Sequence, residues 1–469
     1  MWFKELNKNE VFNSLSKITD RLGLQSFVVG GFVRDYILGI KSSDIDIVVV
    51  GSGIDLAKEY CKEVGGTLSI YASYGTAAVK TPWGEEVEFV GARKESYTRG
   101  SRNPVVSSGS LSDDLGRRDF TINAMAICLC GDSRFGELID MFNGYTDLQN
   151  GIIKTPVDPN ITFLDDPLRS LRCIRFASRY GFKIEDNTWN GLVRNASLIG
   201  NIVWERISSE VCKILEGNNP KYGMELLQEC GILKIILPEV SRLDTNDLTA
   251  TTKPHKNNFW HSISVLDNVS KVSGNIWLRW AALLHDIGKE STKHYDPITG
   301  WSFYNHELVG ADMIKPIFTR FKLPLGDEYS YVYRLVSMHM RPQTIANNEV
   351  TDSAVRRLCN DFGPGIEDLI TLCECDITTK NLDKKNTFIE RFGRVRDMIK
   401  DLQERDYIRL FQPVLGGDDI MRILNLRPGR LVGELKEFLK ESILDGKIDN
   451  RREDLERLLI DKARDIGLI

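Results

Sequence analysis

Residues 25–50 read QSFVVGGFVRDYILGIKSSDIDIVVV, and this stretch decides the fold of the first part of the chain. An apolar run rich in valine ends at Gly30 and Gly31, a segment with helical spacing ends at Gly39, and a second apolar run starts at Asp44. A period of two on either side of a helical period predicts a strand, a short helix and a second strand.

The strand pattern fades further along the chain. Residues 78–90, AVKTPWGEEVEFV, predict a hairpin that turns near Pro82–Gly84. From about residue 160 onward, apolar residues recur at spacings of three and four, which is typical of helices. The change predicts an α+β fold in which a small head with a mixed β-sheet precedes an all-α neck, body and tail. We expect four domains, at residues 1–150, 151–243, 244–384 and 385–469, with a polar linker from Asp244 to Asn258.

The composition is that of an ordinary globular protein of 469 residues, with 42% hydrophobic residues and a net charge of −5. No run approaches the roughly 18 apolar residues of a membrane-spanning helix. The nine cysteines are scattered and odd in number, so we expect reduced thiols in a cytoplasmic protein. Arginines gather at residues 117–118, 169–179 and 427–430, and such local patches can bind phosphate although the total charge is negative.

Asp44 and Asp46 are separated by one residue in an expected strand, so both side chains lie on one face. Two adjacent carboxylates repel each other, and both stay ionised when a cation lies between them. A hard divalent ion, usually Mg2+ beside a triphosphate, meets this need. The alternative is a solvated pair at a strand edge, which is the commoner fate of such a motif. Ile45 and Ile47 make the opposite face apolar, which favours a catalytic metal site.

The two glycines before the expected helix indicate a possible phosphate contact. A strand that ends in Gly30 and Gly31 and opens into a helix can bring backbone N–H groups close to an anion. Arg34 lies one turn into this helix, where it can reach a triphosphate oxygen. A Gly-Gly pair alone indicates only a tight turn.

Four further segments follow one another in a defined order. They read PVVSSGSLSDDLGRRDFTINAMAI, GYTDL, LDDPLRSLRCIRFASRYGF and ERISSEVCKIL, after the opening VVGGFVRDYILG and SSDIDIVVVG. Together they resemble the bacterial-type (class II) tRNA nucleotidyltransferases, the CCA-adding enzymes, and their poly(A) polymerase relatives. The resemblance covers roughly residues 25 to 240. It implies two-metal nucleotidyl transfer, with Mg2+ held by Asp44 and Asp46.

The resemblance also assigns residues to the incoming nucleotide. It implies triphosphate contacts from Gly31, Arg34 and Arg118. We expect Asp166 and Arg169 to lie three apart on one helix and to share a face. A carboxylate there accepts from an exocyclic amine and a guanidinium donates to the acceptor edge of a base, which selects CTP and ATP without a nucleic-acid template. The alternative for this pair is a surface salt bridge.

Several neighbours have other expected roles. Arg172 and Arg175 continue the helical row and contact the base or the phosphates, whereas Asp119 and Asn123 tie the head together. The family usually has glutamate at the position of Asp165, so the role of Asp165 stays open.

Two glutamates of the expected hairpin, Glu86 and Glu88, point to the same side of their strand. Glu88 is a candidate third acidic ligand beside the metal pair. A solvated strand face explains both glutamates equally well, so neither is assigned to the site.

The second half of the chain carries a histidine and aspartate pattern. Five of the six histidines fall within residues 255–306. His261 in FWHSISVLDN, His285 and Asp286 in LLHDIGK, and Asp376 in LCECDITTK follow the order H…HD…D. This order resembles the HD superfamily of metal-dependent phosphohydrolases, and it implies that the four residues bind a second divalent ion, whose identity stays open.

Two features around this pattern extend it. LLHDIGK predicts an apolar helix that carries His285 and Asp286 into a core and ends near Gly288. His306 and His339 occupy positions at which two-metal members of the superfamily carry extra ligands. For these two residues, a hydrogen-bonded core histidine is an equally good interpretation.

Together the two resemblances imply an enzyme that adds CCA to tRNA 3′ ends from CTP and ATP, with a phosphohydrolase activity at the HD residues. Poly(A) addition is the alternative within the same chemistry, although poly(A) polymerases of this family tend to carry long basic flanking segments. A third hypothesis makes the HD hydrolase the main activity and the head a degenerate binding module. Some bacteria also divide CC and A addition between two proteins.

Two further segments have expected roles in RNA binding. Arg427 and Arg430 flank the LRPGR turn of the tail, which can hold an RNA phosphate or can be a capped helix junction. The loop from Thr98 to Ser112, rich in glycine, serine and asparagine, is expected to move when the enzyme switches from C to A addition.

Overall fold

The computed structural model describes residues 1–96, 105–131, 133–244, 257–296, 298, 300–347, 351–379, 381–410, 413–444 and 447–468. Much of the expected loop from Thr98 to Ser112 and nearly all of the expected linker after Asp244 lie outside these residues. The chain forms two compact units, Met1–His339 with Thr371–Thr378, and Met340–Ile370 with Thr379–Ile469. The four domain boundaries stay a prediction.

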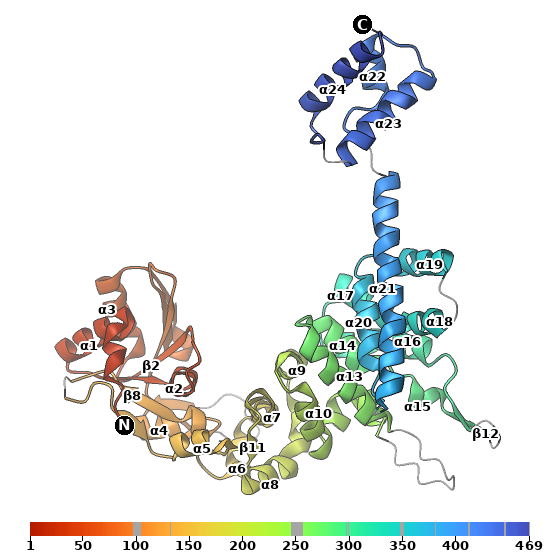
Figure 1. Ribbon diagram of the computed structural model, residues 1–469. Helices are drawn as coiled ribbons and strands as arrows, with labels where there is room; N and C mark the ends of the chain where they lie inside the picture. The colour runs from red at the N-terminus through yellow and green to blue at the C-terminus, as the bar shows by residue number, and fades with distance from the viewer. Residues whose placement is uncertain are drawn as a thin grey trace. The chain divides into compact units, whose positions relative to one another are not determined.

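The head is built on a seven-stranded sheet, in the order β3-β4-β5-β2-β1-β8-β9 (Figure 1). Only β2 and β5 pair in parallel within this sheet, so the expected mixed sheet and the α+β class are confirmed. The strands are β1 (Gln25–Val29), β2 (Asp44–Val50), β3 (Thr67–Tyr71), β4 (Thr76–Lys80), β5 (Glu86–Gly91), β8 (Met125–Cys128) and β9 (Leu138–Asp140).

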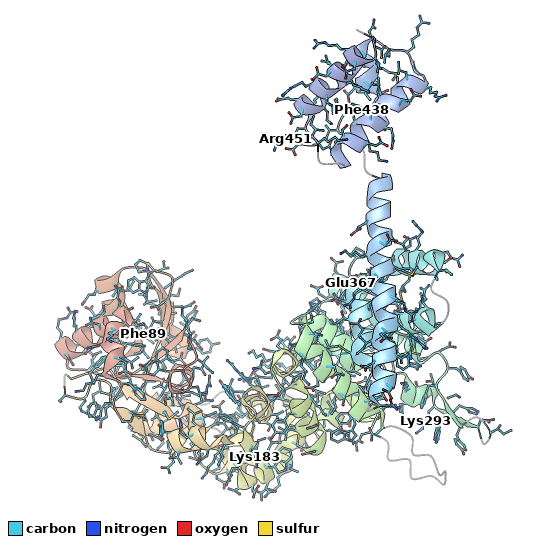
Figure 2. All side chains as sticks on the ribbon, viewed as in Figure 1. Phe89, Lys183, Lys293, Glu367, Phe438 and Arg451 are labelled. Carbon is cyan, nitrogen blue, oxygen red and sulfur yellow. The ribbon has the colours of Figure 1, made fainter. Side chains whose placement is uncertain are left out.

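The expected strand, helix and strand at residues 25–50 are present as β1, α2 and β2, and the expected hairpin is present as β4 and β5. Phe89 on β5 is fully buried and packs against Tyr60 of α3, with 5.4 Å between the ring centroids (Figure 2). The helices and the small hairpin of the head are α1 (Glu10–Leu22), α2 (Gly31–Ile37), α3 (Gly53–Val64), α4 (Leu111–Gly116), α5 (Gly144–Asn150), β6 (Arg93–Ser96) and β7 (Val105–Ser108).

The neck is mainly helical, but it is not all-α as expected, because β10 (Ile152–Ile153) and β11 (Lys183–Ile184) pair in parallel within it. A buried ion pair joins two of its helices. Arg175 of α7 donates from Nε to Glu210 of α9 at 2.6 Å. The neck helices are α6 (Pro159–Asp165), α7 (Leu168–Tyr180), α8 (Asp186–Asn195), α9 (Trp204–Glu216), α10 (Pro220–Glu229), α11 (Ile232–Ile236) and α12 (Pro238–Ser241).

The body carries the apolar LLHDIGK segment, and here the structure differs from the expectation. Helix α14 ends at Leu284 rather than near Gly288, and the chain continues through a turn in which the Ile287 N–H donates to the Leu284 carbonyl. His285 and Asp286 are nonetheless buried, as expected. The body elements are α13 (Asn258–Val272), α14 (Ile276–Leu284), α15 (Lys289–Thr292), β12 (His294–Asp296), β13 (Gly300–Ser302), α16 (His306–Arg320), α17 (Asp327–Met338) and α20 (Ile366–Asp376).

The second unit contains a separate helical core around the buried Leu435, Leu439, Leu455 and Leu459. In the tail, Arg430 is almost fully exposed and pairs with Glu434. The helices are α18 (Met340–Asn347), α19 (Asp352–Phe362), α21 (Leu382–Leu410), α22 (Gly417–Leu424), α23 (Arg430–Leu444) and α24 (Arg452–Asp465). Among the described residues, none of the helices combines the length and the apolar character that crossing a membrane requires.

Replacing Gly144 tests the packing of α5 on the segment that leads into β8. A Cβ at Gly144 would lie 2.1 Å from the carbonyl oxygen of Thr121. We expect Gly144→Ala to cost about 1–3 kcal/mol through overpacking, which thermal unfolding measures as a lower Tm. The matched control is Gly274→Ala, because a Cβ there meets no atom within 4 Å. Equal Tm values for the two variants would contradict the close contact.

Candidate active site and candidate metal centre

A polar cleft of about 370 Å³ lies where β1, β2 and α7 meet. Its walls come from the turn after β1, from the start of β2, from the segment after α4 and from one face of α7. The lining residues are Gly30, Gly31, Arg34, Asp35, Ser42, Asp44, Asp46, Arg118, Asp119, Asn123, Arg172, Arg175, Phe176 and Arg179. The structure therefore brings most of the expected nucleotide site together, and arginines dominate its lining.

Asp44 and Asp46 stand at the start of β2, on the face that opens to the cleft. Burial first, and then the neighbouring charge of Asp44, raise the pKa of Asp46 from 3.8 to about 6, although Arg118 opposes the rise. Two carboxylates that disfavour each other's charge are a suitable pair of ligands for a hard divalent ion. The residues present fit Mg2+.

The strand register shows which of the two glutamates, Glu86 or Glu88, lies nearer to Asp46. In the parallel pairing of β2 and β5, Asp44 lies opposite Glu86, and Asp46 lies opposite Glu88. Burial, followed by the charges of Asp44 and Glu86, raises the pKa of Glu88. Glu88 is thus the glutamate nearer to the partly buried member of the pair, and its role as a ligand stays open.

The turn at Gly30 lets Arg118 approach the carboxylates of Asp44 and Asp46. Gly30 has a φ of 71°, and a Cβ there would lie 2.6 Å from Nη1 of Arg118 and 3.6 Å from Oδ2 of Asp46. A side chain at this position would therefore displace the guanidinium. Arg118 also pairs with the buried Asp114 at 3.2 Å. The absence of a side chain at Gly30 thus allows a cation to lie beside the two carboxylates.

Arg34 forms part of the cleft wall, and two of its nitrogens already donate hydrogen bonds within the protein. Its Nε donates to Asp35 at 2.8 Å, and its Nη1 donates to Asn123 at 2.6 Å. The guanidinium carbon lies 5.1 Å from the ring centroid of Phe176 and 5.4 Å from that of Tyr180. Arg34 therefore supplies positive charge at a fixed position.

The arginines of α7 are held by carboxylates. Arg172 donates to Asp119 from Nε at 2.8 Å, and Asn123 donates to Asp119 at 2.9 Å. Burial alone would raise the pKa of Asp119, but Arg172 and Asn123 hold it below its usual value. These contacts favour the expected role of Asp119 and Asn123 in tying the head together. Arg179, which the sequence analysis counted only within a basic patch, also lines the cleft.

The expectation that Asp166 and Arg169 share one helical face is wrong. Asp166 has extended backbone angles between α6 and α7, because the residue before a proline, here Pro167, disfavours the helical conformation. Its carboxylate accepts from the Leu168 N–H at 3.1 Å and pairs with Arg206 at 3.0 Å.

Arg169 has a different anchor. It donates to the carbonyl oxygen of Arg117 at 2.7 Å, so it is linked to the residue next to Arg118. Neither Asp166 nor Arg169 is among the residues that line the cleft.

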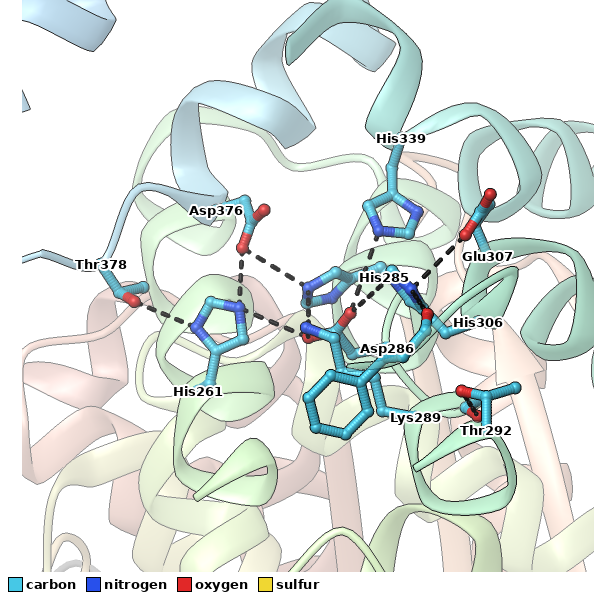
Figure 3. A network of polar contacts seen from close by, with 12 residues as sticks. His261, His285, Asp286, Lys289, Thr292, His306, Glu307, His339, Asp376 and Thr378 are labelled. Atoms are coloured by element: carbon cyan, nitrogen blue, oxygen red, sulfur yellow. Dashed lines mark hydrogen bonds and ion pairs between the residues drawn. The ribbon is translucent and has the colours of Figure 1, made fainter. Parts of the chain in front are cut away.

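A second cluster of metal-ligand residues lies in the body. We call His261, His285, Asp286, His306, His339 and Asp376 the HD cluster (Figure 3). Nε2 of His261 lies 2.7 Å from Oδ1 of Asp376, and Nε2 of His285 lies 3.5 Å from the same oxygen. The four residues of the H…HD…D order therefore meet in one place, and the structure also brings His306 and His339 to Asp286.

The second nitrogen of each imidazole has its own partner. Nδ1 of His285, His306 and His339 lies 2.7–2.9 Å from a backbone carbonyl oxygen. A carbonyl only accepts, so Nδ1 carries the proton and Nε2 is turned toward the carboxylates. Nδ1 of His261 lies 3.0 Å from the hydroxyl of Thr378, a residue that the sequence analysis did not identify. The rings are thus oriented as metal ligands usually are.

The charges of the HD cluster favour a cation. Burial disfavours a charged His285, but Asp286 and Asp376 outweigh it and raise the pKa of His285 to about 10. Burial of Asp286 is likewise outweighed by His285 and Lys289, which hold its pKa well below the usual range. Lys289, also missed by the sequence analysis, lies 2.6 Å from Asp286 at the i+3 spacing of HDIGK. A bound divalent metal would take the place of the proton on His285, and a donor set of imidazoles and carboxylates fits such an ion.

Three segments of the chain match known protein families. Residues 26–154 match the poly A polymerase head domain, and residues 181–243 match the probable RNA and SrmB-binding site of polymerase A. Residues 258–384 match the HD domain.

Three curated proteins are similar to this chain in sequence. An A-adding tRNA nucleotidyltransferase of Deinococcus radiodurans is 30% identical over 91% of this chain and 93% of its own length. A multifunctional CCA protein of Neisseria gonorrhoeae is 34% identical over 71% of this chain and 80% of its own length. An A-adding tRNA nucleotidyltransferase of Geobacter sulfurreducens is 38% identical over 49% of this chain, which spans only 26% of that relative.

Among solved structures, the Thermotoga maritima CCA-adding enzyme complexed with tRNA is similar with a TM-score of 0.58 and 23% identity, over 96% of this chain and 94% of that chain. At this identity, the likeness concerns the fold.

The raised pKa of Asp46 predicts how its charge affects stability. Its pKa in the folded protein is about 6, above the ordinary value of 3.8. Between pH 3.8 and pH 6, Asp46 is therefore protonated in the folded chain but ionised in the unfolded chain. The metal-free protein therefore loses stability as the pH rises through this window, and the full cost is present above pH 6. In EDTA, we expect Asp46→Asn to raise the Tm more at pH 8 than at pH 5.

Glu86→Gln is the control for this measurement, because Glu86 is exposed on the neighbouring strand and is not among the groups that shift Asp46. It should leave the pH dependence of the Tm unchanged. If Asp46→Asn raised the Tm by the same amount at pH 5 and pH 8, the ionised carboxylate of Asp46 would not destabilise the folded protein.

Proposed function

Because the chain belongs to the family of bacterial-type tRNA nucleotidyltransferases and poly(A) polymerases, we propose that it adds C, C and A to tRNA 3′ ends from CTP and ATP. The observation that carries the proposal is the cleft in which Asp44 and Asp46 lie beside Arg118 and the arginines of α7. A carboxylate pair for a metal and a cationic wall for a triphosphate are the two parts that nucleotidyl transfer needs.

Asp44 and Asp46 are the proposed ligands of Mg2+. When bound there, Mg2+ supplies a lower pKa for the attacking RNA 3′ hydroxyl and charge neutralisation for the triphosphate. In the reaction, the 3′ oxygen forms a bond to the α-phosphorus, pyrophosphate leaves, and the proton of the hydroxyl passes to solvent. The chain's task is to hold both reactants in line, which is how most phosphoryl transfer is catalysed.

Arg118 is the proposed main contact of the triphosphate. Arg34 and Arg175 are neutralised by Asp35 and Glu210, respectively. Arg118 shares the carboxylate of Asp114 with Arg117, and it lies next to the glycine turn. A charge-assisted contact from a guanidinium suits a phosphate oxygen.

Asp166 and Arg169 are the proposed readers of the base. The bond from Arg169 to the Arg117 carbonyl couples the base reader to the backbone beside the triphosphate contact. The carboxylate of Asp166 can accept a hydrogen bond from a base only after its ion pair with Arg206 is broken. The selection of CTP and ATP thus rests on residues at the start of α7.

A second candidate activity is hydrolysis of phosphate esters at the HD cluster, and the geometry of that cluster favours it. Four imidazoles turn Nε2 toward two buried or partly buried carboxylates. Together with the first activity, this would let one chain trim a 2′,3′-cyclic or phosphorylated RNA end and then rebuild it.

One assay tests the main proposal. Purified protein is incubated with tRNA that lacks its 3′ end, with CTP and ATP offered singly and together. We expect an extension of three residues that needs CTP before ATP. If the protein adds only A, and only to tRNA that already ends in CC, the activity is A addition rather than CCA addition. A long A tail would indicate poly(A) synthesis. No incorporation would reject CCA addition, A addition and poly(A) synthesis.

Paired variants separate the two sites. Asp44→Ala removes one proposed Mg2+ ligand, so we expect at least a 100-fold loss of nucleotide addition by analogy with the loss of other electrostatic catalysts, with phosphate release unchanged. Asp286→Ala should show the reverse pattern. Loss of nucleotide addition in Asp286→Ala would contradict the independence of the sites.

A further inference from the structure

Two cysteines at the end of β8 lie in contact with each other. Sγ of Cys128 and Sγ of Cys130 are 3.5 Å apart, and Sγ of Cys128 also lies 3.4 Å from the carbonyl oxygen of Cys130. Cys128 is the last residue of β8, and the chain bends at Cys130. Side chains two residues apart along a strand point to the same side. The fold therefore holds two thiols next to each other.

We propose that Cys128 and Cys130 form a site of reversible disulfide formation, with a low-molecular-weight disulfide as the oxidant. Cys130 is the attacking thiol, and Cys128 is the resolving thiol. The inference does not depend on either activity proposed above, because neither cysteine lines the nucleotide cleft or belongs to the HD cluster.

Hydrogen bonds fix the backbone on both sides of Cys130. The Leu129 N–H donates to the carbonyl oxygen of Ser26 on β1 at 2.9 Å. The Gly131 N–H donates to Oδ1 of Asp20 on α1 at 2.7 Å. Because both neighbours of Cys130 are anchored to other elements, the approach of the two sulfurs is a property of the fold. Groups held in this way react as if they were at a very high concentration, which favours an attack of one thiol on the other.

The two thiols differ in exposure. Cys128 is fully buried in a core cluster with Phe27 of β1 and with Leu111 and Leu115 of α4. Cys130 packs at the edge of this cluster and is partly exposed. An oxidant from solution can therefore reach Cys130 but not Cys128, and this difference sets the order of the two steps.

The charges around the pair also favour Cys130 as the nucleophile, since the thiolate is the reactive form of cysteine. The hydrogen bond with Cys128 lowers the pKa of Cys130, although burial opposes this effect. The charge of Asp20 also raises the pKa of Cys130, and the charge of Arg134 lowers it. The contact between the sulfurs raises the pKa of Cys128. The negative charge is thus favoured on the partly exposed sulfur, and the proton stays on the buried one.

The reaction consists of two successive thiol–disulfide exchanges. In the first exchange, the Cys130 thiolate forms a bond to one sulfur of the oxidant, the S–S bond of the oxidant breaks, and the leaving thiolate takes a proton from solvent. In the second exchange, Sγ of Cys128 forms a bond to Sγ of Cys130 and displaces the other half of the oxidant, which takes the proton of Cys128. The two cysteines are oxidised by two electrons, and the oxidant is reduced to two thiols.

The chain contains a second pair of cysteines with the same spacing, Cys373 and Cys375. Both lie on α20, and side chains two residues apart on a helix do not face each other. The Cys373 thiol instead donates to the carbonyl oxygen of His339 at 3.0 Å. The same spacing thus gives two adjacent thiols at the end of a strand and two separate thiols on a helix. Cys373 and Cys375 therefore serve as a control within the same chain.

Mass spectrometry of tryptic peptides tests the proposal on the full chain. Cleavage after Arg118 and Arg134 leaves both cysteines of the site in one peptide, residues 119–134. The reduced protein is incubated with oxidised glutathione, free thiols are alkylated, and the chain is digested without reductant. We expect residues 119–134 to lose two hydrogens and to take up no alkyl group, and dithiothreitol to restore both thiols. In the peptide of residues 358–380, Cys373 and Cys375 should stay reduced.

Two variants test the order of the steps, once thermal unfolding has shown that each is folded. Cys128→Ser has no resolving thiol, so residues 119–134 should gain one glutathione on Cys130. In Cys130→Ser the remaining thiol is buried, so the same peptide should carry no glutathione.

The unaltered chain decides whether the site exists, because this measurement needs no variant. Two free thiols or a persistent mixed disulfide in residues 119–134 would overturn the proposal. Disulfide formation between Cys373 and Cys375 at the same rate would show that the contact at β8 has no effect. Absence of glutathione from Cys128→Ser, or glutathione on Cys128 in Cys130→Ser, would overturn the assigned roles of the two thiols.

Discussion

The buried carboxylate of Asp119 links the head to α7, and the shape of the candidate nucleotide cleft depends on this link. It accepts hydrogen bonds from Asn123 and Arg172, and Asn123 in turn accepts from Arg34. Removing one partner of a buried ion pair typically costs about 3–5 kcal/mol. The network therefore fixes α7 against the sheet, so that the metal pair at the start of β2 and the arginines of α7 face the same space.

Both candidate sites hold carboxylates that need a nearby cation, but the other potential ligands differ between the two sites. In the head, Asp46 is held near Asp44 and a guanidinium, at a site that suits oxygen-loving Mg2+. In the body, imidazoles surround Asp286, and such a mixed set accepts a wider range of metals. The two sites share no residue, so the proposed nucleotide addition and the proposed hydrolysis can be tested separately.

The sequence predicts elements that local patterns determine. The strand, helix and strand of residues 25–50 follow from periodicity. The ordered motifs identify the carboxylates and histidines that the structure brings together in the cleft and in the HD cluster, and their role as metal ligands stays a prediction. The helical placement of Asp166 failed because Pro167 breaks the helix between Asp166 and α7. Contacts between distant segments leave no such local pattern, so the approach of Thr378 to His261 becomes evident only in the folded chain. Lys289 lies only three residues after Asp286, and this local spacing is the signal that could have identified it.

The central claim is that nucleotide addition takes place in the cleft between β2 and α7. The most direct measurement is a crystal structure of the unaltered chain with Mg2+ and a CTP analogue that carries a methylene group between the α- and β-phosphates. The account predicts Mg2+ between Asp44 and Asp46, the triphosphate against Arg118, and the base beside Asp166 and Arg169. A triphosphate bound outside this cleft would contradict it.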